Sequence, residues 1–184
     1  YDIFFSPTTV HTAEIEQRFS LKNKEIINVG YPKIEELKNK MLDLEETDNI
    51  LIAPTWGNDS SLYSAILLDL IDHLIKKKFT IILRPHPMSF KKDKKKITEL
   101  VSKYKWYEKF KLNSDNDNNN IFLKSKILIT DWSGAGIEFS LSKEKPSLFI
   151  DTKQRIRNSS FKHGDKILET TFENFSRDDL GIVL

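Results

Sequence analysis

Residues 126–138 read KILITDWSGAGIE, and this stretch is the clearest guide to the fold. Its first part, Lys126–Thr130, is a largely apolar run, which is typical of a strand buried on both faces of a parallel sheet. Small residues follow at once, and they predict a tight turn that opens a helix at Ile137–Leu141. A strand, a tight turn and a helix in this order predict one repeating unit of an α/β sheet.

Six other runs are strand candidates, and most of them are continuous apolar runs: Asp2–Phe5, Glu25–Val29, Asn49–Ala53, Phe79–Leu83, Trp106–Leu112 and Ser147–Ile150. Residues with helical spacing lie between several of them, most clearly Leu62, Ile66, Leu70 and Leu74. Successive strands are ~20–30 residues apart, which is what a parallel crossover needs. We therefore expect an α/β fold with a doubly wound, mainly parallel, Rossmann-like sheet in a single domain over residues 1–184. The segment Phe172–Leu184 is expected to start a further helix.

Composition argues against several classes of protein. Lys and Arg number 29 against 27 Asp and Glu, whereas a dedicated nucleic-acid binder usually carries a much larger basic excess. There is no cysteine, which excludes disulfides and thiolate metal sites. No spacing of His, Asp and Glu indicates a metal cage, and no apolar run approaches the length of a membrane span. We therefore expect no nucleic-acid partner, no metal and no cofactor.

Unusual residues gather where four of the expected strands end. They are Gly30-Tyr31-Pro32-Lys33, Pro54-Thr55-Trp56-Gly57, Arg84-Pro85-His86-Pro87 and Asp131-Trp132-Ser133-Gly134-Ala135-Gly136. In an open parallel sheet, ligands bind at the carboxyl ends of the strands. The sequence therefore predicts a binding site along one edge of the sheet.

The turn within the opening stretch has the chemistry of a phosphate site. Small residues at Gly134 and Gly136 let a phosphate approach backbone N–H groups at the positive end of a helix, and Ser133 adds a hydroxyl donor. Asp131 begins this turn, and Glu138, one turn into the helix, is within reach of the paired hydroxyls of a ribose. An equally simple interpretation is a tight strand–helix turn, with Asp131 as N-cap and the glycines present for close packing.

Arg84 and His86 form a second group of candidates. Pro85 and Pro87 fix the backbone around them, and both side chains are able to donate to an anionic oxygen. The alternative is an exposed loop with an incidental histidine. Because His86 lies between two prolines just after a buried strand, we interpret it as functional.

The segment after Asn49–Ala53 adds two more candidates. Thr55 is able to bond a phosphate or sugar oxygen, and Trp56 is able to wall the site, although a core anchor explains Trp56 equally well. A third feature is the run Lys91–Lys96, which is most simply a solvated helix face. Its alternative role is docking to an anionic membrane, where each charge near the surface adds about 1 kcal/mol.

Together these motifs resemble the C-terminal half of the CDP-glycerol glycerophosphotransferase family, which builds teichoic-acid-like and capsular polymers. The resemblance is carried by Val29-Gly30-Tyr31-Pro32, Ala53-Pro54-Thr55-Trp56, Arg84-Pro85-His86-Pro87, Thr130-Asp131-Trp132-Ser133-Gly134 and Lys145-Pro146. It implies a GT-B-like architecture of two Rossmann-type halves, with this chain as the nucleotide-donor half of a longer protein. It also implies a place in the bacterial cytoplasm, peripheral at the inner face of the cell membrane.

The resemblance further implies roles for residues and partners. Arg84 and His86 are expected to act in catalysis by stabilising the donor phosphates, Ser133 and Gly134 to contact the same diphosphate, and Thr55 to lie nearby. The general base is expected in the N-terminal half, so the chain alone is expected to be inactive. Implied partners are CDP-glycerol or another nucleotide-diphosphate donor, a polymer or lipid-linked acceptor, the N-terminal Rossmann half, and an anionic membrane surface.

Two other functions fit parts of the sequence. The Ser133-Gly134 turn and Glu138 are similar to UDP-N-acetylglucosamine 2-epimerases, which share the fold, so a UDP-sugar glycosyltransferase or epimerase is an alternative. A non-catalytic nucleotide-binding module is another. A binding comparison of CDP-glycerol with UDP-sugars separates the three.

Overall fold

A computed structural model describes residues 2–9, 12, 16, 24–56, 66–114, 120–152 and 177–184. The chain divides into two compact units. One holds the described residues up to Glu36, and the other holds those from Leu37 to Thr152 and from Arg177 to Leu184. Helix α2 (Pro32–Met41) begins in the first unit and continues into the second.

The first unit contains a parallel pair of strands, β1 (Ile3–Ser6) and β2 (Glu25–Asn28), with Ile3 opposite Glu25. Both expected strands therefore form, but they pair with each other and not with the main sheet. The motif Gly30-Tyr31-Pro32-Lys33 therefore follows a strand of the two-stranded sheet, and the expectation that it follows a strand of the main sheet is wrong. Gly30 has a φ of 73°, a left-handed conformation that favours glycine.

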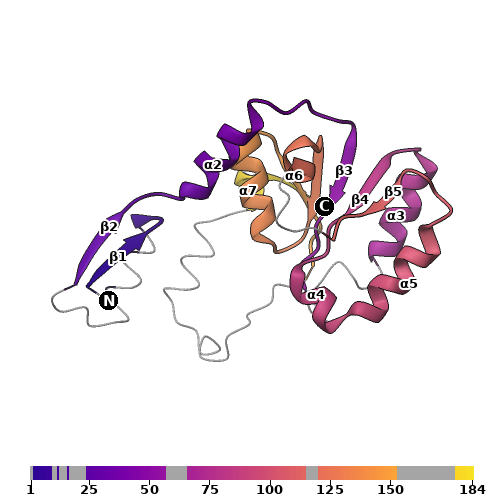
Figure 1. Ribbon diagram of the computed structural model, residues 1–184, viewed down its shortest axis with the longest axis horizontal. Coiled ribbons are helices and arrows are strands. Elements are labelled where there is room, and N and C mark those ends of the chain that lie inside the picture. Colours follow the sequence, from indigo (N-terminus) through magenta and orange to yellow (C-terminus); the bar gives the residue numbers. More distant parts are fainter. Residues whose placement is uncertain are drawn as a thin grey trace. The chain divides into compact units, whose positions relative to one another are not determined.

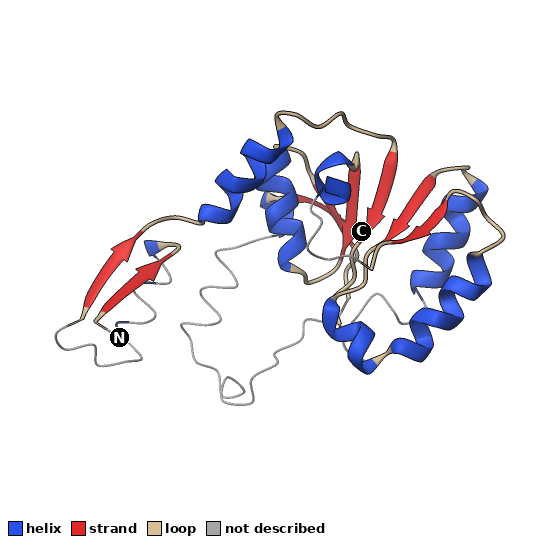
Figure 2. Ribbon diagram, viewed as in Figure 1, coloured by secondary structure: helices blue, strands red, loops and turns tan. Residues whose placement is uncertain are grey.

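The second unit is built on a six-stranded sheet in the order β5-β4-β3-β6-β7-β8, and every neighbouring pair is parallel (Figures 1 and 2). The strands are β3 (Asn49–Ile52), β4 (Thr80–Leu83), β5 (Phe110–Leu112), β6 (Ile127–Thr130), β7 (Ser147–Phe149) and β8 (Gly181–Val183). Between them lie α3 (Ile66–Lys76), α4 (Pro87–Lys92), α5 (Lys94–Tyr104), α6 (Asn120–Lys124), α7 (Gly134–Lys143) and the 3-10 turn η2 (Arg177–Asp179). The strand order reverses between β3 and β6, which is the Rossmann arrangement.

Each central strand supplies side chains to two apolar cores, one on each face of the sheet. Ile50 and Ile52 of β3 pack with α3 and α5, whereas Leu51, between them, packs with α2, α6 and α7. Figure 1 shows α3 and α5 on one side of the sheet and α6 and α7 on the other. Burying one such aliphatic side chain contributes about 1.5–3 kcal/mol, so a continuous apolar strand stabilises both layers. The expected doubly wound α/β fold is confirmed.

The structure corrects two of the expected elements. The run Trp106–Leu112 becomes a strand only from Phe110, because Trp106 and Tyr107 lie in a turn where the Tyr107 hydroxyl donates to Phe79 O (2.9 Å). The helix expected to start in Phe172–Leu184 is wrong over residues 177–184, which form η2 and the sixth strand; residues 172–176 lie outside the described ranges.

Strand β8 depends on a glycine. A Cβ at Gly181 would lie 1.8 Å from Ser147 O of the neighbouring strand β7, a distance that no side chain tolerates. Gly181 therefore allows the backbone of β8 to approach β7 closely.

Among the described residues, no helix is both long and apolar enough to cross a bilayer.

Candidate functional site

The candidate site is at the carboxyl ends of β3 and β6, where the strand order reverses and helices leave for opposite faces of the sheet. Thr55 follows β3 and Asp131 follows β6, and both are buried. The Thr55 backbone N–H donates to Asp131 Oδ1 (2.8 Å), and the Thr55 hydroxyl donates to the same oxygen (2.5 Å). One carboxylate thus ties the two central loops together.

These two hydrogen bonds, called here the Thr55–Asp131 brace, change the interpretation of Thr55. Its hydroxyl proton is donated to Asp131, so in this structure the side chain does not offer that proton to a phosphate. Thr55 and Asp131 together fix the two loops that carry Trp56 and Ser133. Their expected direct contact with substrate remains a prediction.

Ser133, and not Asp131, caps helix α7. Its backbone is extended (φ −105°, ψ 140°), and its Oγ accepts a hydrogen bond from Ala135 N (3.2 Å). The next residue, Gly134, is exposed, and a Cβ there would meet no atom of the described residues within 4 Å. Over the part of the chain that the structure describes, the surface above the positive end of this ten-residue helix is open, as a phosphate site requires.

Packing accounts for the second glycine of the turn. A Cβ on Gly136 would come within 2.4 Å of Phe149 Cε1 and 3.2 Å of Thr130 Cγ2. Glycine at this position therefore lets α7 lie directly against Phe149, the last residue of β7. The expected roles of Gly136 and Glu138 in substrate binding remain predictions; Glu138 lies half-buried in the second turn of α7.

Arg84 and His86 follow β4, on the other side of β3 from β6. The Arg84 backbone N–H donates to Ile52 O (2.8 Å), and its guanidinium carbon lies 5.6 Å from the centre of the Phe122 ring. Phe122 in turn meets Phe139 of α7 edge to face, with ring centres 5.5 Å apart. Arg84 is therefore on the face of the sheet that α7 covers, at the same carboxyl edge as Ser133.

His86 is the N-cap of α4. Its Nδ1 accepts a hydrogen bond from Met88 N (3.1 Å), which requires an unprotonated Nδ1 and leaves the proton of a neutral ring on Nε2. The exposed ring of His86 therefore presents Nε2–H as its second polar group. A donor of this kind suits an anionic oxygen.

Trp56 lies at the rim and not in either core. Its ring is half-buried, with the His86 ring 6.1 Å away and Lys92 Nζ 4.8 Å from its centre. Lys92 is the last residue of α4, so this short helix places a cation against the Trp56 ring in the loop that follows β3. Sequence reasoning missed Lys92, because nothing distinguishes it from the other lysines of the run Lys91–Lys96.

The opposite, amino edge of the sheet carries a different set of charges. Lys143 and Lys145 both pair with Glu46 (2.9 and 2.5 Å to Oε2). These hydrogen bonds, that from Lys145 first, hold the pKa of Glu46 below its ordinary value. The motif Lys145-Pro146 thus belongs to this edge.

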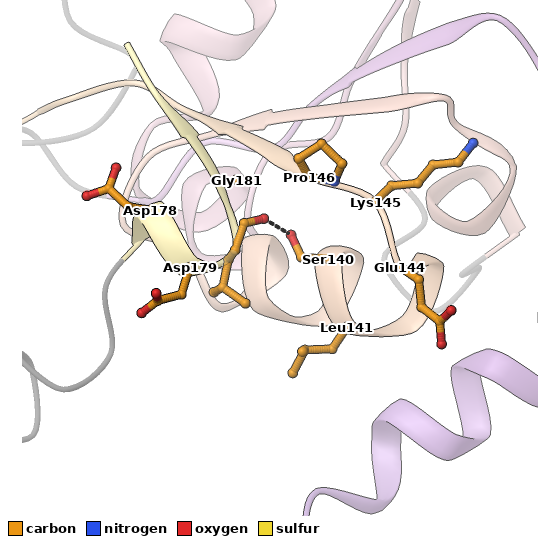
Figure 3. Close-up of a pocket in the computed structure, with 9 residues that line it drawn as sticks. Ser140, Leu141, Glu144, Lys145, Pro146, Asp178, Asp179 and Gly181 are labelled. Atoms are coloured by element: carbon orange, nitrogen blue, oxygen red, sulfur yellow. Dashed lines mark hydrogen bonds between the residues drawn. The ribbon is translucent and has the colours of Figure 1, made fainter.

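The pocket of Figure 3 also lies beyond the expected site, and none of the expected site residues lines it. Its wall includes Lys145, Gly181 and Ser140, whose hydroxyl donates to Leu180 O (2.7 Å). Among the described residues, no group of three or more His, Asp or Glu is placed to hold a metal ion.

The family model described as CDP-Glycerol:Poly(glycerophosphate) glycerophosphotransferase matches residues 1–155. The chain belongs to this family. The resemblance inferred from the motifs is therefore confirmed, and the match runs through every motif on which it was based.

Two curated relatives are teichoic acid poly(glycerol phosphate) polymerases. The protein of Staphylococcus epidermidis is 27% identical in a 172-residue alignment that covers 82% of this chain and 22% of that protein. The protein of Bacillus spizizenii is 30% identical in a 170-residue alignment that covers 81% of this chain and 40% of that protein. The chain therefore spans well under half the length of these relatives.

Solved structures support the fold. A variant of the wall teichoic acid polymerase TagF soaked with CDPG has a TM-score of 0.52 at 25% identity, covering 82% of this chain and 38% of that one. The UDP-GlcNAc 2-epimerase of Methanocaldococcus jannaschii, in complex with UDP-GlcNAc and UDP, has a TM-score of 0.52 at 16% identity, covering 96% and 55%. The second likeness shows the shared fold alone.

Proposed function

We propose that this chain supplies the donor site of a transferase that moves glycerol phosphate, or a related alditol phosphate, from a CDP-linked donor to a growing cell-surface polymer. Family membership supports the reaction class. The observation that carries the donor-site assignment is the Thr55–Asp131 brace at the switch point. It ties the loop after β3 to the turn that starts α7, while the parallel order β4-β3-β6 puts the Arg84-Pro85-His86 loop at the same edge of the sheet.

In the proposed reaction, an acceptor hydroxyl attacks the β-phosphorus of the donor. A new O–P bond forms, the bond from the β-phosphorus to the bridging oxygen breaks, and CMP leaves with that oxygen and the bonding electrons. The acceptor proton goes to a general base that we place outside this chain. The task left to this chain is to hold the diphosphate and stabilise its negative charge.

Three groups are suited to that task. The Arg84 guanidinium is a planar, permanently charged donor for phosphate oxygens. His86 is exposed and carries the proton of a neutral ring on Nε2, because its Nδ1 accepts a hydrogen bond from Met88 N. The first turn of α7 adds its positive dipole, and none of the described residues blocks the approach of an anionic oxygen at Gly134.

The test is a calorimetric titration of the 184-residue chain with CDP-glycerol, with UDP-N-acetylglucosamine and with buffer. CDP-glycerol should bind, and the UDP-sugar should bind more weakly. Preference for the UDP-sugar would favour the epimerase-like alternative, while binding of neither would overturn the donor-site assignment. CMP release from CDP-glycerol by the chain alone should be negligible. Release at the rate of an intact polymerase would mean that the general base lies within this chain.

Variants sharpen this test. Arg84→Gln and His86→Ala should each lower the affinity for CDP-glycerol about ten- to a hundredfold, as expected when a donor to a charged group costs about 1.5–3 kcal/mol. The matched control is Lys95→Gln, which removes a charge from an exposed position on α5. Equal affinities in wild type and both site variants would contradict the proposed roles.

For location, we propose a peripheral position against the inner face of the bacterial membrane. The support is the run Lys91–Lys96, whose five lysines are all exposed at the junction of α4 and α5. Sedimentation with vesicles containing anionic lipid should capture the chain more strongly than neutral vesicles, and added salt should abolish the difference. Equal capture by both vesicle types would contradict this location.

A further inference from the structure

Arg177 lies beside the turn that starts the candidate phosphate site. It stands at the start of η2, far along the chain from residue 155, where the family match ends. Its guanidinium carbon is 3.8 Å from the centre of the Trp132 ring. Trp132 is the residue between Asp131 of the brace and Ser133, the cap of α7.

Other contacts hold both members of this stack in place. Arg177 Nη2 pairs with Asp151 Oδ1 (2.6 Å), and Nη1 donates to Ile150 O (3.4 Å). The Trp132 indole N–H donates to Thr152 O (2.6 Å). The segment Ile150–Thr152, which follows β7, therefore contacts the Trp132 ring in two ways. Thr152 binds the indole N–H, and Ile150 and Asp151 hold Arg177 against the face of the ring.

The stack is well shielded, because only 15% of the Arg177 side chain is exposed. A guanidinium lying this close to an indole ring gains both cation–π attraction and planar stacking, and its remaining donors stay available for carboxylate and carbonyl oxygens. A lysine reproduces the charge but neither the planar stack nor the forked geometry.

We propose that Arg177 is a positioning residue for the donor site. It holds Trp132 against the end of β7 and, through the backbone, fixes the turn from Asp131 to Gly134 that presents the start of α7. This role rests on the proposed function of that turn. It also makes residues 177–184 part of the site's support, beyond the stretch that the family match covers.

Backbone hydrogen exchange of the 184-residue chain tests the positioning role without any ligand. In Arg177→Gln, the amides of residues 132–135 should exchange about three- to thirtyfold faster. The reason is that losing a cation–π contact makes local opening of the turn more frequent by that factor. Arg177→Lys should restore little of the protection, and Lys95→Gln should change nothing. The amides of β3 and β4 should exchange as in wild type.

Affinity for CDP-glycerol is the second readout. Arg177→Gln should bind several-fold more weakly than wild type, and Asp151→Asn, which keeps the shape of the contact, should show a smaller loss in the same direction. If Arg177→Gln fails to fold, the comparison of Asp151→Asn with wild type decides the question by the same two readouts.

Two results would overturn the inference. One is unchanged exchange at residues 132–135, and the other is an equal acceleration across the whole sheet, which would mean a general structural role. A wild-type chain that does not bind CDP-glycerol would instead refute the proposed function, while the exchange pattern would still decide whether Arg177 holds the turn.

Discussion

The two ends of the six-stranded sheet use positive charge differently. At the amino edge, only 3% of the Lys143 side chain is exposed, and its ammonium donates to Glu46 Oε2 (2.9 Å) and to the carbonyls of Leu123 and Ser125 (2.6 Å each). At the carboxyl edge, the Arg84 guanidinium lies over the buried Phe122 ring, and the Lys92 ammonium lies over Trp56 at the rim. A lysine whose three donors all point to protein oxygens supports the fold, whereas cations at an open strand edge suit an arriving anion.

This difference predicts that substitutions at the amino edge change stability and leave binding intact. Lys143→Met should lower the free energy of unfolding the most, by about 3 kcal/mol, because it leaves two buried carbonyls and part of the Glu46 charge without their partner. Urea denaturation measures the loss. The matched control is Lys145→Met, at a half-exposed position on the same carboxylate, which should cost under about 1 kcal/mol. Similar losses of unfolding free energy in Lys143→Met and Lys145→Met would mean that burial of the Lys143 ammonium does not make it the more important cation.

The brace at the carboxyl edge is the exception that serves both stability and binding. Asp131→Ala should lower the free energy of unfolding by about 2 kcal/mol, because two buried donors of Thr55 lose their acceptor. Affinity for CDP-glycerol should fall as well, since the two loops are no longer tied. Thr55→Val removes only the hydroxyl donor and should show about half of the stability loss. An Asp131→Ala chain of wild-type stability would mean that the brace contributes nothing.

His86 should affect binding far more than stability. Replacing it with alanine removes the N-cap of α4, which costs about 1 kcal/mol or less in a helix of six residues at the surface. The same variant should lose affinity for CDP-glycerol as described above. Thermal unfolding and calorimetry on one preparation separate the two effects, and a large fall in melting temperature with unchanged affinity would reverse the assignment.

The smallest effect concerns Glu46 and pH. Its folded pKa is lowered from the ordinary value of 4.5 by hydrogen bonds from Lys145 and Lys143. A carboxyl group with a lowered folded pKa contributes stability that is fully present above its unfolded pKa and is lost as the pH falls through the folded value. Glu46→Gln should therefore lower the melting temperature slightly at neutral pH, and this loss should shrink as the pH falls below the ordinary pKa of 4.5 towards the lowered folded value. An effect that does not change with pH would exclude the charge as its cause.

Local sequence predicted the central strands well for a physical reason. The runs that became β3, β4, β6 and β7 are continuous and apolar, and each ends at a turn within one residue of the expected place. Strand β8 was missed because it forms only by pairing with β7. The importance of Gly181 comes from its close approach to Ser147 O of that strand, which the local sequence does not reveal. The pairing of β1 with β2 was likewise not predictable from local sequence, because it depends on which strands meet in space.

The same distinction applies to the candidate site. The edge that carries Arg84, His86 and Ser133 was predictable, because parallel strands place the residues that follow them on one side. The double hydrogen bond from Thr55 to Asp131 was not, since it depends on two loops meeting in space. Lys92 and Arg177 carried no local signal, because each acts through an aromatic ring elsewhere in the chain.

The Thr55–Asp131 brace also sets when the site is able to form during synthesis. The two residues are 76 positions apart, and the strands that carry them are neighbours at the centre of the sheet. At the usual rate of translation, ~5–20 residues per second, Thr55 waits about 4–15 s for its partner to be made. The neighbours of β3 in the sheet are β4 and β6, so throughout that interval β3 lacks one of its two partners. The loop after β3 likewise lacks the Asp131 carboxylate that holds it in the folded chain. Donor binding to a nascent chain should therefore begin only after β6 has left the ribosome.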